Sequence, residues 1–355
     1  MENILDYTRK ELAQWLEDKG SRSFRAGQIF KWIYLKQAQS FDEMTDLGKE
    51  LRGLLLENFY LPRLEIEDRQ VSSDTTEKFL FRLSDGHHIE SVLIPEKDHF
   101  TLCVSTQVGC AMDCQFCLTA KGGLKRNLSV SEIVSQVRDA RFYLLQKKIE
   151  PLKLSNIVFM GMGEPLANYE NLIQSLQILM DTDYGMKFAA RRVTVSTSGL
   201  VPKIEQLGID TDVNLAISLN AVDDRTRSAL MPINNRYPIS VLLEACGKFA
   251  MKPRNKITFE YILIKGVNDS KQDALNLVKL LAPIRAKVNL IPFNEHEASA
   301  FKRPDQKQVL AFLQILLDRN MTAMTRKSKG ADISAACGQL KAKLVMHEDT
   351  EHLKD

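Results

Sequence analysis

Residues 101–120 read TLCVSTQVGCAMDCQFCLTA, and this stretch decides the fold because three cysteines follow directly on a predicted strand. The strand covers residues 101–106, where apolar and small polar residues alternate. Cys110, Cys114 and Cys117 then follow with the spacing C-x3-C-x2-C. Folds built from successive βα units place their active sites in loops at the carboxyl ends of the strands. The stretch therefore predicts an α/β protein with its chemistry in the loop after the first parallel strand.

Predicted strands and helices alternate along the rest of the chain. Helical periodicity fills the intervals between strands, and Ser129 with Glu132 forms a capping box at the start of a helix over residues 129–146. Six such units predict a parallel α/β architecture, either an open doubly wound sheet or a barrel of βα units. The six predicted strands cover residues 101–106, 156–160, 193–197, 213–219, 257–264 and 288–292.

The residues before this region predict two smaller parts. Thr8 and Glu11 form a capping box ahead of an apolar helical face, and two more helices are predicted before Pro62. The period then changes to two, and Asp85-Gly86 predicts the turn of a hairpin. The expected parts are a helical domain (1–62), a β-hairpin linker (63–98), an α/β domain (99–328) and a C-terminal loop and tail (329–355).

Composition excludes some classes of protein and leaves others open. The 355 residues carry a formal net charge of +3 and are 44% hydrophobic, which is ordinary for a globular enzyme. We expect a cytoplasmic protein, because the N-terminus has no apolar signal segment and no stretch reaches the ~20 apolar residues that span a bilayer. Basic residues gather at 121–126, 191–192 and 326–329. Such groups are equally typical of a solvated surface, so they predict no nucleic acid by themselves.

The spacing of the cysteine triad indicates a metal centre. Six cysteines in a reducing compartment are not expected to form a disulfide framework. Thiolates are soft ligands that suit iron-sulfur clusters or zinc, and structural sites of either kind normally use four protein ligands. Here three ligands are close together, so a 4Fe-4S cluster would keep one iron open for a substrate. A zinc site completed by a distant residue and a set of three core cysteines are the alternatives.

The motif with Phe116 before its third cysteine resembles the signature of the radical S-adenosylmethionine (SAM) superfamily. MGMGEP, residues 160–165, resembles the glycine-rich motif with which that superfamily contacts SAM. FMGMGEPLAN, VTVSTSG, LMPINNRYP and DISAACGQL narrow the resemblance to the bacterial radical SAM RNA adenine-C2 methyltransferases. The resemblance covers nearly the whole chain. It implies a partial (βα)6 radical SAM barrel with a small helical domain that binds RNA.

The resemblance also implies which residues bind the cofactors. The triad would hold the 4Fe-4S cluster, and Glu164 would bind the SAM ammonium group. The chain departs from the family at Asn220, where a histidine is usual, and at Ala331-Asp332, where two acids are usual. The implied SAM-binding residues are Gly163, Glu164, Ser196, Ser218, Leu219, Asn220 and Asn294.

Two further cysteines have implied roles in the reaction. The C2 carbon of adenine is electron-poor, so it cannot attack the SAM methyl group as a nucleophile, and a radical route is required. In the family mechanism Cys337 takes a methyl group from one SAM, and a second SAM yields the radical that activates this methyl group. Cys103 then releases the RNA by forming a transient disulfide with Cys337, and Glu90 accepts a proton. Without the resemblance, Cys103 and Cys337 read as buried structural cysteines and Glu90 as an exposed strand carboxylate, and Cys246 is expected in the core.

The implied partners are large-subunit (23S) ribosomal RNA, transfer RNA and an electron-donor protein such as flavodoxin. Pro165 favours the C2 enzymes over the related adenine-C8 methyltransferases of antibiotic resistance, which share the cysteine pattern. A non-catalytic metal-cluster protein that binds RNA is the alternative from another class.

Overall fold

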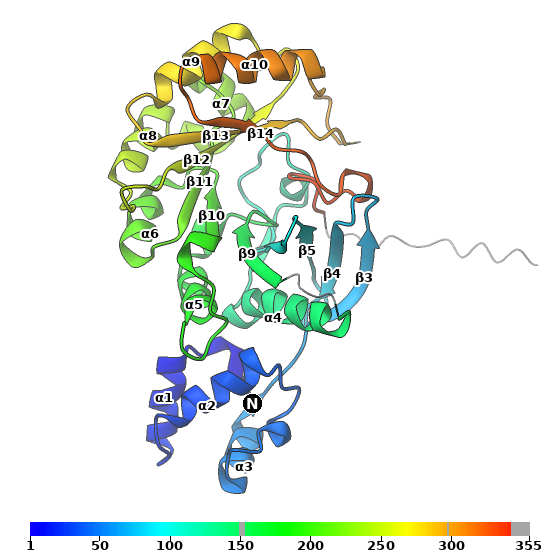
Figure 1. Cartoon of the computed structure of the whole chain (residues 1–355), viewed down its shortest axis with the longest axis vertical. Coiled ribbons are helices and arrows are strands. Elements are labelled where there is room, and N and C mark those ends of the chain that lie inside the picture. Colours follow the sequence, from blue (N-terminus) through cyan, green and yellow to red (C-terminus); the bar gives the residue numbers. More distant parts are fainter. Residues whose placement is uncertain (149–152, 297, 342–355) are drawn as a thin grey trace, which may run out of the picture.

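The computed structural model describes residues 1–148, 153–296 and 298–341, and one ten-stranded sheet dominates it. Seven strands pair in parallel: β6 (His99–Cys103), β9 (Lys153–Phe159), β10 (Val193–Thr197), β11 (Asn214–Ser218), β12 (Ile257–Leu263), β13 (Ala286–Pro292) and β14 (Ala323–Thr325). Three antiparallel strands continue the sheet beyond β6: β5 (His88–Pro95), β4 (Glu77–Arg82) and β3 (Glu65–Val71). The strand order is β14-β13-β12-β11-β10-β9-β6-β5-β4-β3, so β14 and β3 are separate edges and the barrel is open (Figure 1). The partial barrel expected from the resemblance is confirmed.

All six predicted parallel strands are present, and helices cover the outer face of the curved sheet (Figure 1). The capping box before the first barrel helix is also present, because Ser129 Oγ accepts from Glu132 N at 3.2 Å and Ser129 N donates to Glu132 Oε2 at 2.9 Å. Among the described residues, no helix has both the length and the apolar character needed to cross a bilayer. The barrel helices are α4 (Val130–Gln146), α5 (Tyr169–Met180), α6 (Ile204–Asp210), α7 (Asp224–Leu230), α8 (Ile239–Lys248), α9 (Lys271–Leu281) and α10 (Gln306–Asp318).

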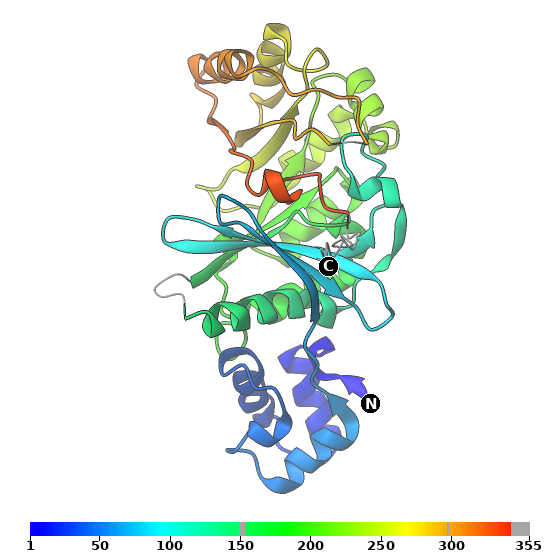
Figure 2. The same ribbon diagram turned by 90° about the vertical axis from the view of Figure 1, so that its right-hand side faces the viewer.

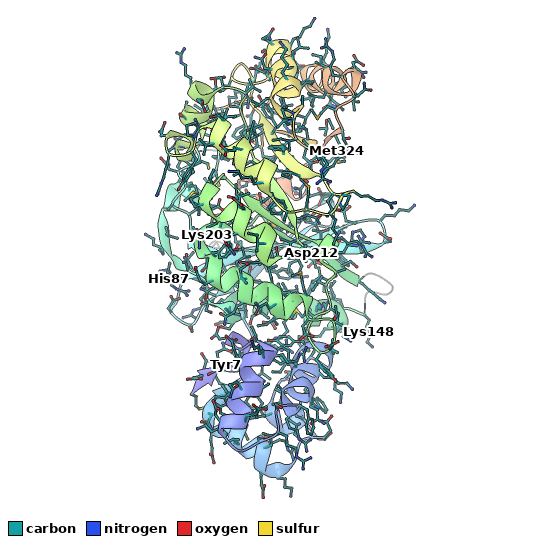
Figure 3. The ribbon with its side chains drawn as sticks, turned by 90° about the vertical axis from the view of Figure 1, so that its left-hand side faces the viewer. Tyr7, His87, Lys148, Lys203, Asp212 and Met324 are labelled. Atoms are coloured by element: carbon teal, nitrogen blue, oxygen red, sulfur yellow. The ribbon has the colours of Figure 1, made fainter. Side chains whose placement is uncertain are left out.

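The first 60 residues form the predicted helical module, which packs against one end of the barrel (Figure 2). Figure 3 shows Tyr7 of this module and Met324 of β14 toward opposite ends of the molecule. Polar contacts fix the module in place, since Asp6 accepts from Ser131 N at 2.7 Å and Arg9 forms a 2.6 Å ion pair with Asp181. Its helices are α1 (Arg9–Asp18), α2 (Arg25–Phe30), which continues into a π-helical turn (Lys31–Leu35), and α3 (Lys49–Asn58).

The segment predicted as a hairpin linker is more than a linker. The hairpin of β4 and β5 is present, and its turn is closed by a 2.8 Å bond from Leu83 N to His87 O. A third strand, β3, precedes it, and β5 pairs with β6 of the barrel. Residues 65–95 therefore extend the barrel sheet in addition to joining the helical module to the barrel. The expected domain boundaries stay predictions.

Candidate active site

Two loops at the carboxyl ends of β6 and β9 meet at glycines. A Cβ atom on Gly161 would lie 2.7 Å from the carbonyl oxygen of Val104. Gly163 has a φ of +101°, and a Cβ atom there would lie 2.5 Å from Cβ of Gln107. Glycine is required at both positions because any side chain would push the loops apart. The loop of the cysteine triad and the loop of Glu164 are thereby held against each other.

The three cysteines of the triad line one cavity of about 140 Å³. Cys110 and Cys114 are buried, and Cys117 is partly exposed. Burial raises the pKa of the Cys110 thiol to about 12, and it raises the pKa of Cys114 well above its ordinary value. Cys117 and Cys110 raise the pKa of Cys114 further, so the three sulfur atoms are near enough to interact electrostatically. The structure therefore brings together the three predicted cluster ligands.

The donor set of the triad fits a cluster better than a single ion. No three His, Cys, Asp or Glu side chains among the described residues converge as one bound metal ion would require. A 4Fe-4S cluster is larger, and each thiolate binds a different iron, so its ligands need not point at one centre. When bound, the cluster would be held by Cys110, Cys114 and Cys117 on one wall of the cavity.

Glu164, the acid implied to bind the SAM ammonium group, lies in the same cavity as the triad. It is 3% exposed and lines the cavity. Its carboxylate accepts from Ser198 N at 2.7 Å, from Ser198 Oγ at 2.8 Å and from Leu166 N at 3.1 Å. Burial raises its pKa, and the bonds from Ser198 oppose that effect. The carboxylate is therefore held rigidly beside the triad.

The lining of the cavity also includes Glu260, an acid that the sequence did not point to. Its Oε1 accepts from Asn289 at 3.0 Å, and burial raises its pKa. Its Oε2 has no hydrogen-bond partner in the described parts of the chain. A buried carboxylate oxygen without a partner is costly, so this part of the lining suits a cationic ligand such as SAM. The signal in the sequence was a lone acid inside the apolar strand ITFEYIL.

The other predicted SAM-binding residues fall into two groups. Ser196, Ser218 and Asn220 line the cavity with Gly163 and Glu164. Asn220 has a φ of +59°, which asparagine tolerates well, and its Oδ1 accepts from Ile262 N at 2.8 Å. The departure from the family's histidine thus leaves a residue whose amide supports the next strand.

Two predicted SAM-binding residues lie outside this lining. Leu219 is fully buried in the core, where its backbone oxygen accepts from Arg227 at 3.1 Å. Asn294 instead contacts the segment of Cys337, with a 3.3 Å bond from its Nδ2 to the Cys337 oxygen. Direct contacts from these two side chains to SAM stay predictions.

Cys103 and Cys337 come together, although 234 positions separate them in the sequence. Both line a cavity of about 70 Å³ together with Met160 and Arg326, and Cys337 also lines the cavity of the triad. Burial raises the pKa of Cys103 to about 12, Cys337 raises it further and Arg326 opposes both. Arg326 therefore favours the thiolate form of Cys103. In the sequence Arg326 belongs to a basic group typical of a solvated surface, so this role was not predicted. Cys246 lies in the core, as expected.

Glu90 is buried in β5 and is not among the residues that line either cavity of Cys337. It is 3% exposed, its Oε1 lies 3.1 Å from Nζ of Lys78, and its Oε2 accepts from Lys341 N at 2.8 Å. The reading of Glu90 as an exposed strand carboxylate is therefore wrong. Val92 and Ile94, on the same face of β5, line the cavity of Cys103 and Cys337.

The segment of Cys337 lies across the loop of the triad and is attached at several points. Leu118 N donates to the Gly338 oxygen at 2.7 Å, and Thr119 Oγ1 donates to the Leu340 oxygen at 2.6 Å. Asp332 is part of the second departure from the family. Its carboxylate accepts from Ser72 Oγ at 2.5 Å and from Ser73 N at 2.9 Å. The predicted tail over residues 342–355 lies outside the described residues.

Comparison with known proteins agrees with this geometry. Residues 2–61 match the ribosomal RNA large subunit methyltransferase N-terminal domain, and residues 104–278 match the radical SAM superfamily. A dual-specificity RNA methyltransferase RlmN from Desulfosudis oleivorans is 60% identical over 96% of this chain and 91% of its own length. An enzyme with the same name from Geobacter sulfurreducens is 54% identical over 94% of this chain and 90% of its own. The crystal structure of a radical SAM methyltransferase from Sphaerobacter thermophilus superposes with a TM-score of 0.89 at 45% identity, covering 97% of this chain and 100% of that one. The chain belongs to the RlmN family of radical SAM dual-specificity RNA methyltransferases.

Proposed function

We propose that this protein methylates C2 of an adenine in large-subunit (23S) ribosomal RNA and in transfer RNA. The relatives named above are dual-specificity RNA methyltransferases, which supports an RNA substrate. Two SAM molecules would be used in each turnover, and an electron-donor protein such as flavodoxin would serve as the reductant.

One observation carries this proposal. Cys337 lines both the cavity of the cluster triad and the smaller cavity of Cys103. A methyl carrier has to face the SAM site and also the thiol that later releases the product. A buried structural cysteine would need neither contact, so the shared position favours chemistry over packing.

The residues divide the work as follows. The thiolate of Cys337 attacks the methyl carbon of the first SAM, so an S–CH3 bond forms and S-adenosylhomocysteine leaves. When bound, the cluster supplies the electron that cleaves the second SAM. The 5′-deoxyadenosyl radical from the second SAM would take a hydrogen atom from the S-methyl group of Cys337, and the resulting carbon radical would add to C2. The adduct would give its odd electron back to the cluster, and Glu90 would accept the C2 proton. Cys103 would then attack the sulfur of Cys337, so the S–CH2 bond breaks, its electron pair and a proton turn CH2 into the methyl group of the released RNA, and a disulfide between the two cysteines remains.

Variants of the two cysteines test this order of steps. Cys337→Ala should keep its cluster and accept no methyl group. Cys103→Ala should accept a methyl group on Cys337 and then stall with RNA covalently attached, which a denaturing gel shows as a shifted band. Cys246→Ala, a core cysteine outside both cavities, is the matched control and should turn over. A covalent RNA adduct in Cys337→Ala would exchange the two assigned roles.

A separate measurement tests the modified carbon. Pro165, which follows Glu164 at the start of a 3-10 turn (Pro165–Asn168), supports the C2 assignment by resemblance. RNA that lacks the modification is incubated with the enzyme and SAM, and the methyladenosine isomer is identified by mass spectrometry against standards. We expect 2-methyladenosine. Predominant 8-methyladenosine would overturn the specificity and leave the cysteine roles intact.

A further inference from the structure

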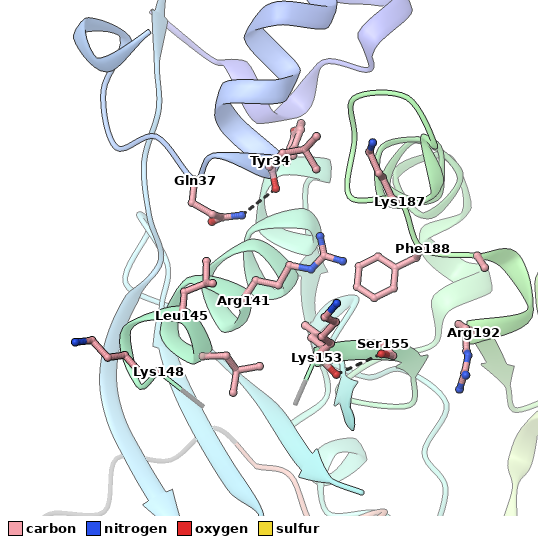
Figure 4. A pocket seen from close by; sticks show the side chains of 14 residues that line it. Tyr34, Gln37, Arg141, Leu145, Lys148, Lys153, Ser155, Lys187, Phe188 and Arg192 are labelled. Atoms are coloured by element: carbon pink, nitrogen blue, oxygen red, sulfur yellow. Dashed lines mark hydrogen bonds between the residues drawn. The ribbon is translucent and has the colours of Figure 1, made fainter. Parts of the chain in front are cut away.

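A second cavity, of about 510 Å³, lies between the helical module and the barrel (Figure 4). Its walls come from Tyr34 of the module, from α4, from the first residues of β9 and from residues 187–189 before β10. These are the amino ends of the strands, whereas the cysteine triad lies at the carboxyl ends. The seven residues of β9 span ~20 Å, so the two sites are well separated.

The charge of this cavity is strongly one-sided. Five cationic side chains line it, and none of the lining residues is acidic. Within the described residues, none of the five has a carboxylate within ion-pair distance. Figure 3 shows one of them, Lys148, at the end of α4 near the helical module. Asp98 interacts electrostatically with Arg192 from beyond ion-pair distance. Like charges gathered with no ion-pair partner in the described parts of the chain favour an anionic ligand. The five are Arg141, Lys148, Lys153, Lys187 and Arg192.

Arg141 is the central cation of the group. Figure 4 shows its side chain extending from α4 toward Phe188. The guanidinium lies 4.4 Å from the centroid of the Phe188 ring, and that ring is 3% exposed. Burial lowers the pKa of Arg141 to about 10, so it stays charged at neutral pH. Stacking on an aromatic ring leaves the edge donors of a guanidinium available, and these match a phosphate well.

The remaining walls are apolar. Leu144 and Leu154 face the cavity beside Phe188 and Ala189. The volume is that of pockets that enclose a small organic molecule and is larger than a bare phosphate needs. A ligand that fills the cavity must therefore combine an anionic group with a flat or apolar group.

We propose that this cavity binds a nucleotide, with the phosphate at Arg141 and Lys187 and the base against the leucine wall. The nucleotide can be free or can belong to an RNA strand, because both present the same chemistry. Binding of a free nucleotide here does not depend on the proposed methylation. Binding of a nucleotide within an RNA strand rests on the proposed RNA substrate.

Binding of uridine monophosphate to the full-length, cluster-loaded enzyme tests the free source. A pyrimidine nucleotide is chosen because adenine could enter the SAM site. By calorimetry, Arg141→Gln should weaken binding about 10- to 100-fold and Lys187→Ala several-fold, as expected for charge-assisted bonds to phosphate. Lys307→Ala, which removes one charge from the exposed face of α10, is the matched control and should bind as the parent does. Inorganic phosphate should bind more weakly than the nucleotide.

A short single-stranded RNA tests the second source with the same variants. Loss of RNA affinity in Arg141→Gln and Lys187→Ala, without binding of free uridine monophosphate, would assign the nucleotide to a strand. Lys187 is exposed, so its variant keeps the test valid even if Arg141→Gln unfolds. The proposal is overturned if neither ligand depends on Arg141 or Lys187 while the parent enzyme methylates RNA. Nucleotide binding without methylation would instead remove only the proposed function.

Discussion

Arg227 joins the loops that follow β10 and β11, and its replacement tests how that edge of the barrel is held. The guanidinium donates to the oxygens of Ser198 at 2.7 Å, Ser218 at 3.1 Å and Leu219 at 3.1 Å, and to Oδ1 of Asn234 at 3.0 Å. The side chain is fully buried. Burial lowers its pKa to about 10, so it is charged at neutral pH.

Arg227→Met keeps much of the aliphatic volume and removes every donor. Each of the four neutral acceptors then stays buried without its donor, at about 1–3 kcal/mol for each, while the desolvation cost of the buried charge disappears. We therefore expect a net loss of about 3–5 kcal/mol. At roughly 2 °C for each kcal/mol in a chain of this size, the unfolding midpoint should fall roughly 6–10 °C. SAM affinity should fall about tenfold as well, because Ser198 also holds Glu164.

Thermal unfolding followed by circular dichroism and equilibrium dialysis of SAM provide the two measurements. Arg225→Met is the matched control, since it makes the same substitution on an exposed position of α7. Arg227→Lys should be intermediate, because an ammonium keeps the charge and cannot reach all four acceptors. Equal midpoints for Arg227→Met and Arg225→Met would refute the reasoning.

Three further variants test other contacts of the site. Glu164→Gln should weaken SAM binding at least tenfold in equilibrium dialysis. Burial raises the pKa of Glu164, so as the pH is lowered the parent should lose SAM affinity at a higher pH than it would with an exposed acid, and the variant should not show this pH dependence. Gly163→Ala forces a Cβ atom to 2.5 Å from Gln107 and should lower the unfolding midpoint and SAM affinity together, whereas Gly53→Ala, with open space around it, should do neither. Asp332→Asn should slow methylation of RNA in a single-turnover assay without loss of SAM binding. Hydrogen bonds lower the pKa of Asp332 to about 2, so its carboxylate is ionised above about pH 4 and the effect of the variant should be the same at every pH above that value.

Most of the fold could be predicted from local patterns, and the missed strands show where such patterns fail. The six parallel strands are buried and bounded by turns, so their apolar runs are visible in the sequence. β3 reads EIEDRQV and is largely exposed, so it has no apolar face to detect. β14 has three residues, too few for any periodicity.

The same difference separates the site residues that the sequence predicts from those that it does not. The triad lies within eight residues, so its spacing was legible. Arg227 gives no such signal, because a charged residue on a seven-residue helix reads as surface. Its burial depends on acceptors from two other loops, and only the folded chain brings these together. Glu260 is similar, since its missing partner is a property of the cavity and not of the strand.

The antiparallel strands hold both ends of the segment of Cys337. One end of the segment is fixed by Asp332 to Ser72 and its neighbour, beside the turn of β3 and β4. The other end is fixed by the bond from Lys341 N to Glu90 of β5. Both attachments lie on the extension of the barrel sheet, so under the proposed mechanism Cys337 would move between SAM and RNA within residues 333–340. That movement would also break the bonds that Gly338 and Leu340 accept from the loop of the triad. A separate linker could move against the barrel and would carry both ends with it, whereas strands paired through β5 to β6 belong to the same sheet as the loop of the triad. If Cys337 is the methyl carrier, as proposed, this extension would limit how far it travels.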